Sequence, residues 1–253
     1  MGYFETEYYR NFLAKNGNLI RLKATYLKRE RNILNKNTSH FWDKKFNLKE
    51  KRKEFSYVEE DRINIVYKFL KRRKGKLLDL GFGQAKLENL LQKELGIELF
   101  GLDISPTMVK RAKRNLRGDY KFGSVFRLPY ESNFFDFIIA MEILEHITPS
   151  KVFKVYKGML RILKKNGYLI VTVPMNEPLQ HMVEVENINP NGHMRVYTPE
   201  LIKSELRIAG FTCVAEFYLY AFRSGYKWKK MFVKYLPFVN RLPNNIVLIA
   251  KKI

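Results

Sequence analysis

A glycine turn and a distant aspartate are the residues in this sequence whose types and spacing could do chemistry. The turn is Gly81-Phe82-Gly83, and it follows the apolar run of residues 76–80. Glycines at such a point let the backbone turn sharply and approach a ligand, because no Cβ is in the way. Asp103 ends a second apolar run, where its carboxylate could accept hydrogen bonds from both hydroxyls of a ribose. Together these residues predict a site for a ligand that contains a nucleoside.

The turn could serve two kinds of nucleoside cofactor. A dinucleotide-binding turn needs a third glycine at position 86, where this chain has Lys86. Asp79 precedes the turn and would repel a pyrophosphate, whereas it would attract a cationic ligand. The residues therefore favour a cofactor that carries positive charge near the glycines.

The composition is that of one core-forming domain with appendages. The chain has 253 residues, of which 46% are hydrophobic. We find neither a signal peptide nor an apolar run long enough to span a membrane. The single cysteine, Cys213, excludes internal disulfides and suits a reducing compartment. We therefore expect a cytoplasmic protein, with peripheral membrane contact left open.

Positive charge is concentrated at the two ends of the chain. The net charge is +22, yet the central part is nearly neutral. We expect a basic helical N-terminal extension over residues 1–60 and a catalytic domain over residues 61–253. Within that domain, residues 221–241 form a basic insertion before the last strand. Basic ends favour an anionic partner, either phospholipid or nucleic acid, although a merely solubilising lysine surface is the simpler alternative.

Strands and helices alternate from residue 76 onwards, which is typical of a parallel sheet covered on both faces. The predicted strands are residues 76–80, 97–102, 120–124, 134–141 and 168–173. Ser105, Thr148 and Thr198 each precede a proline, the arrangement of a helix N-cap. Asn166-Gly167 is expected to end the helix that precedes the fifth strand.

Residues 35–53 show weak periodicity and many lysines, and we expect a loop there or a segment that orders on a ligand. Phe41, Trp42 and Phe46 are large apolar residues that are not expected to stay exposed to solvent. They should therefore pack on the body of the domain or over the cofactor site. A helix should follow over residues 57–71.

The ordered motifs resemble those of the class I S-adenosylmethionine-dependent methyltransferases. They are LDLGFG, GLDIS, FDFIIAMEILEHI, KKNGYLIVTVP and GHMRVYTPELIKSELRIAGF. The similarity is to the branch that modifies quinones, lipids and other metabolites. It implies a Rossmann-like α/β fold, with a seven-stranded, mostly parallel sheet, helices on both faces and a final hairpin of residues 211–220 and 246–251. It also implies S-adenosylmethionine as cofactor and S-adenosylhomocysteine as product.

The resemblance assigns roles to the residues around the glycine turn. Gly81 and Gly83 would lie against the methionine end of the cofactor, and Asp79 near its ammonium group. Asp103 would bind the ribose, and Ile104 would form an apolar wall for the adenine. The remaining positions carried over are Phe82, Ser124, Val125, Met141 and Glu142. Of these, Phe82 could narrow the pocket, and Ser124 could accept a hydrogen bond from the adenine amino group.

The acceptor is less well defined by the sequence. Motifs for methylating the amines or ring carbons of bases are missing, which argues against nucleic acid as the methyl acceptor. His193, His146 and Glu142 are the candidate general bases. No cluster of His, Cys, Asp or Glu has metal-ligand spacing, so we assign no metal. We expect methyl transfer to a heteroatom, most simply oxygen, of a small or lipid-like acceptor; an RNA methyltransferase and a non-catalytic relative are the alternatives.

The insertion at residues 221–241 contains a basic amphipathic helical pattern. Lys227, Lys230 and Lys234 fall on one face, opposite a face rich in aromatic residues. Such a helix could lie on an anionic membrane, or its apolar face could pack on the domain.

Overall fold

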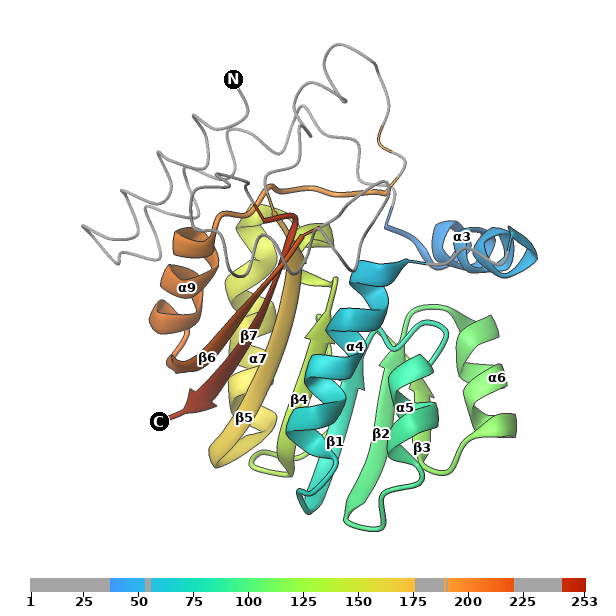
Figure 1. The fold of residues 1–253 in the computed structure, drawn as a ribbon, viewed down its shortest axis with the longest axis horizontal. Helices are drawn as coiled ribbons and strands as arrows, with labels where there is room; N and C mark the ends of the chain where they lie inside the picture. Colours follow the sequence, from blue (N-terminus) through green and yellow to red (C-terminus); the bar gives the residue numbers. More distant parts are fainter. Residues whose placement is uncertain (1–36, 53–55, 176–188, 190, 221–242) are drawn as a thin grey trace.

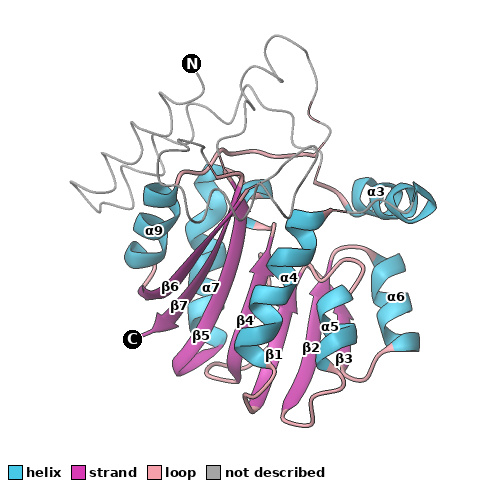
Figure 2. Cartoon of the chain, in the orientation of Figure 1, coloured by secondary structure: helices cyan, strands magenta, loops and turns pink. Residues whose placement is uncertain are grey.

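A seven-stranded sheet forms the centre of the molecule (Figures 1 and 2). The computed structural model describes residues 37–52, 56–175, 189, 191–220 and 243–253. The strands are β1 (Gly75–Leu80), β2 (Ile97–Asp103), β3 (Asp119–Phe122), β4 (Phe135–Met141), β5 (Leu163–Pro174), β6 (Phe211–Leu219) and β7 (Asn245–Lys252). Their order in the sheet is β3-β2-β1-β4-β5-β7-β6, and among these strands β7 runs in the direction opposite to the other six. The predicted Rossmann-like fold and its final hairpin are confirmed.

Helices cover both faces of the sheet (Figure 1). They are α3 (Ser39–Arg52), α4 (Tyr57–Leu70), α5 (Lys86–Leu91), α6 (Pro106–Asn115), α7 (Val152–Ile162) and α9 (Pro199–Ile208), with 3-10 turns η2 (Leu144–His146) and η3 (Pro149–Lys151). Leu77 faces the cluster under α4 and α5, whereas the next residue, Leu78, faces the cluster under α7 and α9. Successive side chains of a strand point to opposite faces, so one apolar run serves both layers.

The chain order places a crevice at the end of β1. From β1 the sheet continues to β2 and β3 on one side and to β4 on the other. In open α/β sheets the crossover helices diverge at such a point, and ligands bind outside the carboxyl ends of the strands there. The glycine turn follows β1 and Asp103 ends β2, so both lie at this crevice.

Two of the three predicted proline-linked caps are confirmed. The side chain of Ser105 accepts the Met108 N–H at 3.2 Å, and that of Thr198 accepts the Leu201 N–H at 3.3 Å. Thr148 precedes η3 without a capping hydrogen bond from its side chain, and the α-helical part of that segment starts only at Val152. Thr148 therefore lies at the start of a helical segment as predicted, but its side chain does not form the predicted capping hydrogen bond.

Two local predictions were wrong. Residues 39–52 form a helix and not a loop. Tertiary contacts of its aromatic residues stabilise this helix, although its sequence lacks a regular apolar stripe. Asn166 does not end a helix; α7 ends at Ile162, and β5 begins at Leu163. Asn166, with φ +64°, lies in an irregularity of β5, where the register against β4 shifts between Phe135 and Phe137.

The basic ends lie largely outside the described residues. This applies to residues 1–36 and to residues 221–242, including Lys227, Lys230 and Lys234. The domain boundary at residue 60 stays a prediction. Among the described helices, none combines the length and apolar character needed to cross a membrane.

Candidate functional site

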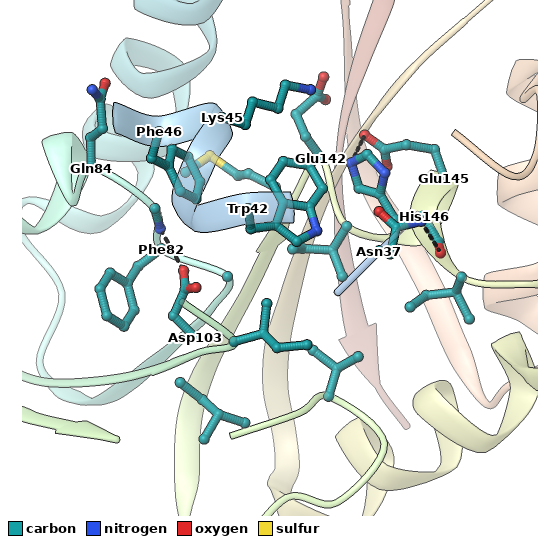
Figure 3. Close-up of a pocket in the computed structure, with 18 of the residues that line it drawn as sticks. Asn37, Trp42, Lys45, Phe46, Phe82, Gln84, Asp103, Glu142, Glu145 and His146 are labelled. Atoms are coloured by element: carbon teal, nitrogen blue, oxygen red, sulfur yellow. Dashed lines mark hydrogen bonds and ion pairs between the residues drawn. The ribbon is translucent and has the colours of Figure 1, made fainter. Parts of the chain in front are cut away.

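A cavity of about 540 Å³ opens at the carboxyl ends of β1, β2 and β4 (Figure 3). Its size is within the usual range of small-molecule sites. The glycine turn, the end of β2 and the loop after β3 form one end. The segment after β4 and the stretch around His193 form the other, and α3 contributes Trp42 and Phe46.

The glycine turn adopts a conformation that requires glycine. Gly81 and Gly83 have φ values of +69° and +53°, in the left-handed region. A Cβ on Gly81 would lie 2.2 Å from Cδ1 of Ile143, and one on Gly83 would lie 2.9 Å from Cζ of Phe46. The turn is thus fitted closely between the segment after β4 and α3, with its backbone against the cavity.

Asp103 is fixed by backbone donors. Its Oδ2 accepts the Gly83 N–H at 2.8 Å, and its Oδ1 accepts the Ser105 N–H at 2.7 Å. Burial raises the pKa of Asp103 from 3.8 to about 6, although both of these hydrogen bonds lower it; the nearby Asp43 and Glu88 raise it further. The carboxylate is therefore oriented in advance, with remaining lone pairs for a ribose.

A pair of buried carboxyl groups lies beside the turn. Asp79 is 1% exposed and Glu88 is equally buried. Burial and the neighbouring Glu88 raise the pKa of Asp79 well above its usual range, and burial raises that of Glu88. Because like charges repel strongly in a buried site, the pair favours a state in which one carboxyl group keeps its proton. Glu88 lines the cavity, whereas Asp79 lies behind it. The sequence analysis identified Asp79 and missed Glu88 as a residue of the cavity wall.

The other residues that the sequence analysis assigned to the cofactor also line the cavity. These residues are Phe82, Ile104, Ser124, Val125, Met141 and Glu142. The ring of Phe82 does not block the cavity, because it packs edge-to-face on Tyr120 at 5.3 Å between ring centroids. A Cβ on Gly101 would lie 2.7 Å from this ring, so a glycine in β2 makes room for it.

Glu142 is a structural junction at the end of β4. Its carboxylate accepts hydrogen bonds from Thr172 Oγ1 and Asn245 Nδ2, both at 2.9 Å, and pairs with Arg62 at 3.0 Å. Its backbone, with φ +55°, turns the chain into the cavity. Three donors already engage this carboxylate, so Glu142 is better placed to order the site than to accept a substrate proton.

His146 lies deep in the wall of the cavity. It is 8% exposed, and its ring packs edge-to-face on Trp42 at 4.7 Å and on His193 at 4.9 Å. Its Nδ1 lies 3.2 Å from the carbonyl oxygen of Gly192. Burial, and then the proximity of His193, lower the pKa of His146 from 6.5 to about 3. At neutral pH the ring is therefore uncharged.

His193 lies in an irregular stretch of the chain, where it is buried and fixed. It is 8% exposed, and Asn189 forms two hydrogen bonds with its backbone, at 3.0 and 3.1 Å. The next residue, Met194, donates its N–H to the carbonyl oxygen of Glu145 at 2.7 Å. These bonds bring His193 beside the segment after β4, although the two are far apart in sequence.

A buried ion pair ties this stretch to α9. Arg195 is 6% exposed, and its Nη2 lies 2.8 Å from both carboxylate oxygens of Glu205. Tyr197 and Tyr156 also donate hydrogen bonds to Glu205. Breaking a buried pair leaves an uncompensated charge, so this network fixes the chain just after His193.

Helix α3 covers the cavity with aromatic rings. Trp42 lies between Phe46 and His146, with 5.8 Å to the first ring and 4.7 Å to the second (Figure 3). Lys45 lies 4.9 Å from the Trp42 ring centroid. The aromatic residues of 39–52 were expected to pack on the body or over the cofactor site, and the structure places Trp42 and Phe46 in the wall of the cavity.

The chain is similar to known methyltransferases. A family model described as a methyltransferase domain matches residues 78–171. An uncharacterised protein of Methanocaldococcus jannaschii is 28% identical over 64% of this chain and 66% of its own length. The 2-methyl-6-phytyl-1,4-hydroquinone methyltransferase of Synechocystis is 29% identical, over 38% of this chain and 30% of its own. Phosphoethanolamine N-methyltransferase 2 of Caenorhabditis elegans is 23% identical, over 45% and 27%.

The matched stretch therefore spans less than two thirds of the length of these curated relatives. Among solved structures, an S-adenosylmethionine-dependent methyltransferase from Archaeoglobus fulgidus has a TM-score of 0.62 with 19% identity. That match covers 82% of this chain and 99% of the other. This likeness shows the shared fold.

Proposed function

We propose that the chain is a class I S-adenosylmethionine-dependent methyltransferase that transfers the cofactor's methyl group to an oxygen of a small or lipid-like acceptor. The reaction is an in-line displacement. A lone pair of the acceptor oxygen forms the new O–C bond, and the C–S bond breaks with its electrons left on sulfur. The acceptor loses its proton, and S-adenosylhomocysteine remains. The protein must therefore hold the donor, aim the acceptor and help remove that proton.

Residues at the glycine end of the cavity suit the cofactor. Asp103, with its carboxylate already oriented by Gly83 and Ser105, would accept the two ribose hydroxyls. The buried pair of Glu88 and Asp79 would take the ammonium group, because a cation relieves the repulsion between two carboxylates. Ile104 and Val125 would flank the adenine.

One observation favours an acceptor that loses a proton on methylation, as a hydroxyl group does. Glu145, His146 and His193 lie together at the far end of the same cavity, with potential ligand atoms within 4.8 Å of one another. Groups of this kind assist the removal of a proton from an acceptor, either directly or through a bound cation. An acceptor that carries no removable proton would have no use for them.

The relatives are compatible with a small or lipid-like acceptor. Two of them are named for a phytyl hydroquinone and for phosphoethanolamine. Three cavity residues, Trp42, Phe46 and Ile63, offer apolar surface to such a molecule. We further propose that the basic residues Lys227, Lys230 and Lys234 bring the protein to an anionic membrane, a prediction that falls outside the described residues.

The test uses methyl-labelled S-adenosylmethionine, the purified chain and an extract of its source cells. Products are separated into organic-soluble, nuclease-sensitive, protein and small polar fractions. Label in the organic or small polar fraction supports the proposal. Label that is lost on nuclease treatment would make the protein an RNA methyltransferase, and cofactor binding without any labelled product would make it a non-catalytic relative. Asp103→Ala is the control for label that does not depend on the site.

The membrane proposal has its own measurement. Replacing Lys227, Lys230 and Lys234 with glutamine removes three positive charges, each worth about 1 kcal/mol near an anionic surface. We expect sedimentation with vesicles rich in phosphatidylserine to fall by at least tenfold, and vesicles of phosphatidylcholine serve as the control. Equal sedimentation of the triple variant and the parent would rule out this contact.

A further inference from the structure

Three potential metal ligands converge at the acceptor end of the cavity. Glu145 is fully buried, and His146 and His193 are each 8% exposed. One ligand atom from each lies within 4.8 Å of the other two. Glu145 and His146 belong to η2, directly after β4, whereas His193 comes from the stretch that precedes α9. The cluster therefore exists only in the folded chain.

The ring of His146 is oriented as a metal ligand would be. Its Nδ1 faces the carbonyl oxygen of Gly192 at 3.2 Å, and a carbonyl can only accept, so Nδ1 carries the proton. The lone pair of Nε2 then points toward Glu145, whose Oε1 is 3.8 Å away. Ligating histidines almost always donate their other ring N–H to a carbonyl or carboxylate in this way.

The distance between Nε2 of His146 and Oε1 of Glu145 suits two ligands of one ion better than a direct bond. A hydrogen bond would need about 3.2 Å or less. Two donor atoms that each lie about 2.1 Å from one cation, at angles of 90–130°, are separated by roughly 3.0–3.8 Å. The observed 3.8 Å falls at the upper end of that range. A small contraction of the cluster would bring all three ligand atoms to one ion.

The backbone around the cluster is held by hydrogen bonds from several elements. Asn37 donates to the carbonyl oxygens of both His146 and Gly192, at 3.3 and 2.7 Å. Met194 donates to the Glu145 carbonyl oxygen, and Asn189 holds the backbone of His193. Such outer contacts orient ligands in metal sites and lower the cost of assembling them.

We propose that Glu145, His146 and His193 form a site for a divalent first-row cation, and that the methyl acceptor is a hydroxyl compound whose oxygen binds to that cation. This inference rests on the proposed function and adds the acceptor's chemistry to it. Two imidazoles and one carboxylate are ligands that suit Zn²⁺, Mn²⁺ or Co²⁺. Three protein ligands leave coordination positions open for a substrate oxygen.

The cation would help remove the proton of the acceptor hydroxyl. Binding of the acceptor hydroxyl to a dication lowers the pKa of that hydroxyl, and its proton passes to solvent water. The oxygen then attacks the methyl carbon, the C–S bond breaks toward sulfur, and the sulfonium charge is neutralised. No electron is gained or lost overall. Glu145 supplies one negative charge to the site, so the ion keeps a net positive charge that stabilises the alkoxide or phenolate.

The first test is binding of the metal alone. Untagged protein is stripped with EDTA and titrated with Zn²⁺ by calorimetry and with Co²⁺ by visible absorption. We expect one equivalent to bind, and we expect His193→Ala and Glu145→Gln to weaken binding by at least about 100-fold. Asp103→Ala is the matched control, because it lies at the other end of the cavity and should bind the metal like the parent. Absence of stoichiometric binding of both ions, or unchanged binding in His193→Ala, would overturn the proposal.

Cofactor binding separates this proposal from the one on which it rests. S-adenosylmethionine is titrated into the stripped protein and into His193→Ala, and circular dichroism verifies their folding. Unchanged cofactor affinity, together with lost metal binding and lost methyl transfer, supports a cation that serves the acceptor. If EDTA-treated protein transfers methyl groups at the full rate, the cation proposal fails while the methyltransferase stands. If the cofactor does not bind at all, the proposed function fails independently of the metal.

Discussion

The two ends of the cavity are built in different ways. The cofactor end comes from the tips of two adjacent parallel strands, with Gly81, Gly83 and Asp103 placed by the register of β1 and β2. The acceptor end is assembled from α3, η2 and the stretch around His193, which are distant in sequence and are joined by hydrogen bonds and buried ion pairs. The first end depends on local backbone geometry and the second on long-range contacts, so different substitutions should damage them.

The largest expected effect is on stability, from the buried pair that holds the acceptor end. Arg195→Met leaves the Glu205 carboxylate buried without its cation, which should cost about 3–5 kcal/mol of unfolding free energy. Chemical denaturation followed by circular dichroism measures it. Lys203→Met is the matched control, because the pair of Lys203 and Glu216 is exposed and should contribute less than about 1 kcal/mol. Equal losses in both variants would show that the buried network does not organise this end.

The next effect concerns the cofactor end alone. Asp103→Ala should weaken S-adenosylmethionine binding beyond detection, at least about 100-fold, since hydrogen bonds to a charged group contribute about 1.5–3 kcal/mol each. The fold should be unaffected. Ser124→Ala removes the neutral partner predicted for the adenine and should weaken binding only about 2- to 10-fold. Calorimetry gives both values, and unaltered affinity in Asp103→Ala would contradict the assignment of this end.

The pH dependence of cofactor affinity should report on the same carboxylate. Asp103 has a pKa of about 6, above its ordinary 3.8, and only the ionised form accepts both ribose hydroxyls. Affinity should therefore fall about 30-fold between pH 7.5 and 4.5. Because the folded-state pKa is raised, the group's contribution to stability is complete below 3.8 and is lost as pH rises through 6. Affinity and stability thus change in opposite directions, and a flat affinity profile would show that Asp103 is already ionised at pH 4.5 or does not bind the ribose.

The smallest effect tests the packing beneath the glycine turn. Gly101→Ala would place a Cβ 2.5 Å from Tyr120 and 2.7 Å from Phe82, so the rings must shift, at about 1–3 kcal/mol. Adding Phe82→Ala should recover part of that loss by removing one of the two rings. Gly158→Ala in α7, where the nearest atom lies at 3.3 Å, serves as the control and should be neutral or slightly stabilising. Thermal unfolding would give the ranking, and equal losses for both glycines would argue against the fit around Phe82.

The two ends of the cavity also differ in how well the sequence predicted them. The strand ends and the glycine turn were predicted in place, because apolar runs and turn chemistry are local signals. The residues after β3 and β4 were assigned from the resemblance to the methyltransferase family. Glu88 was missed because a buried acid in an amphipathic helix looks like any surface acid. Helix α3 was predicted as a loop or as a segment that orders on a ligand, since its stability comes from packing of Trp42 and Phe46 and not from an apolar stripe.

The sequence by itself determined the α/β class, the direction of the strands and the position of the end proposed to bind the cofactor. Each of these depends on a period of two or 3.6 residues and on glycines that few other residues can replace. Only the tertiary structure decided which side chains meet at the acceptor end. Glu145 and His146 join His193 because hydrogen bonds from Met194 and a buried arginine pair bring a distant segment to the end of β4. Spacing along the chain carries no record of such contacts, since packing energy depends on distance in space.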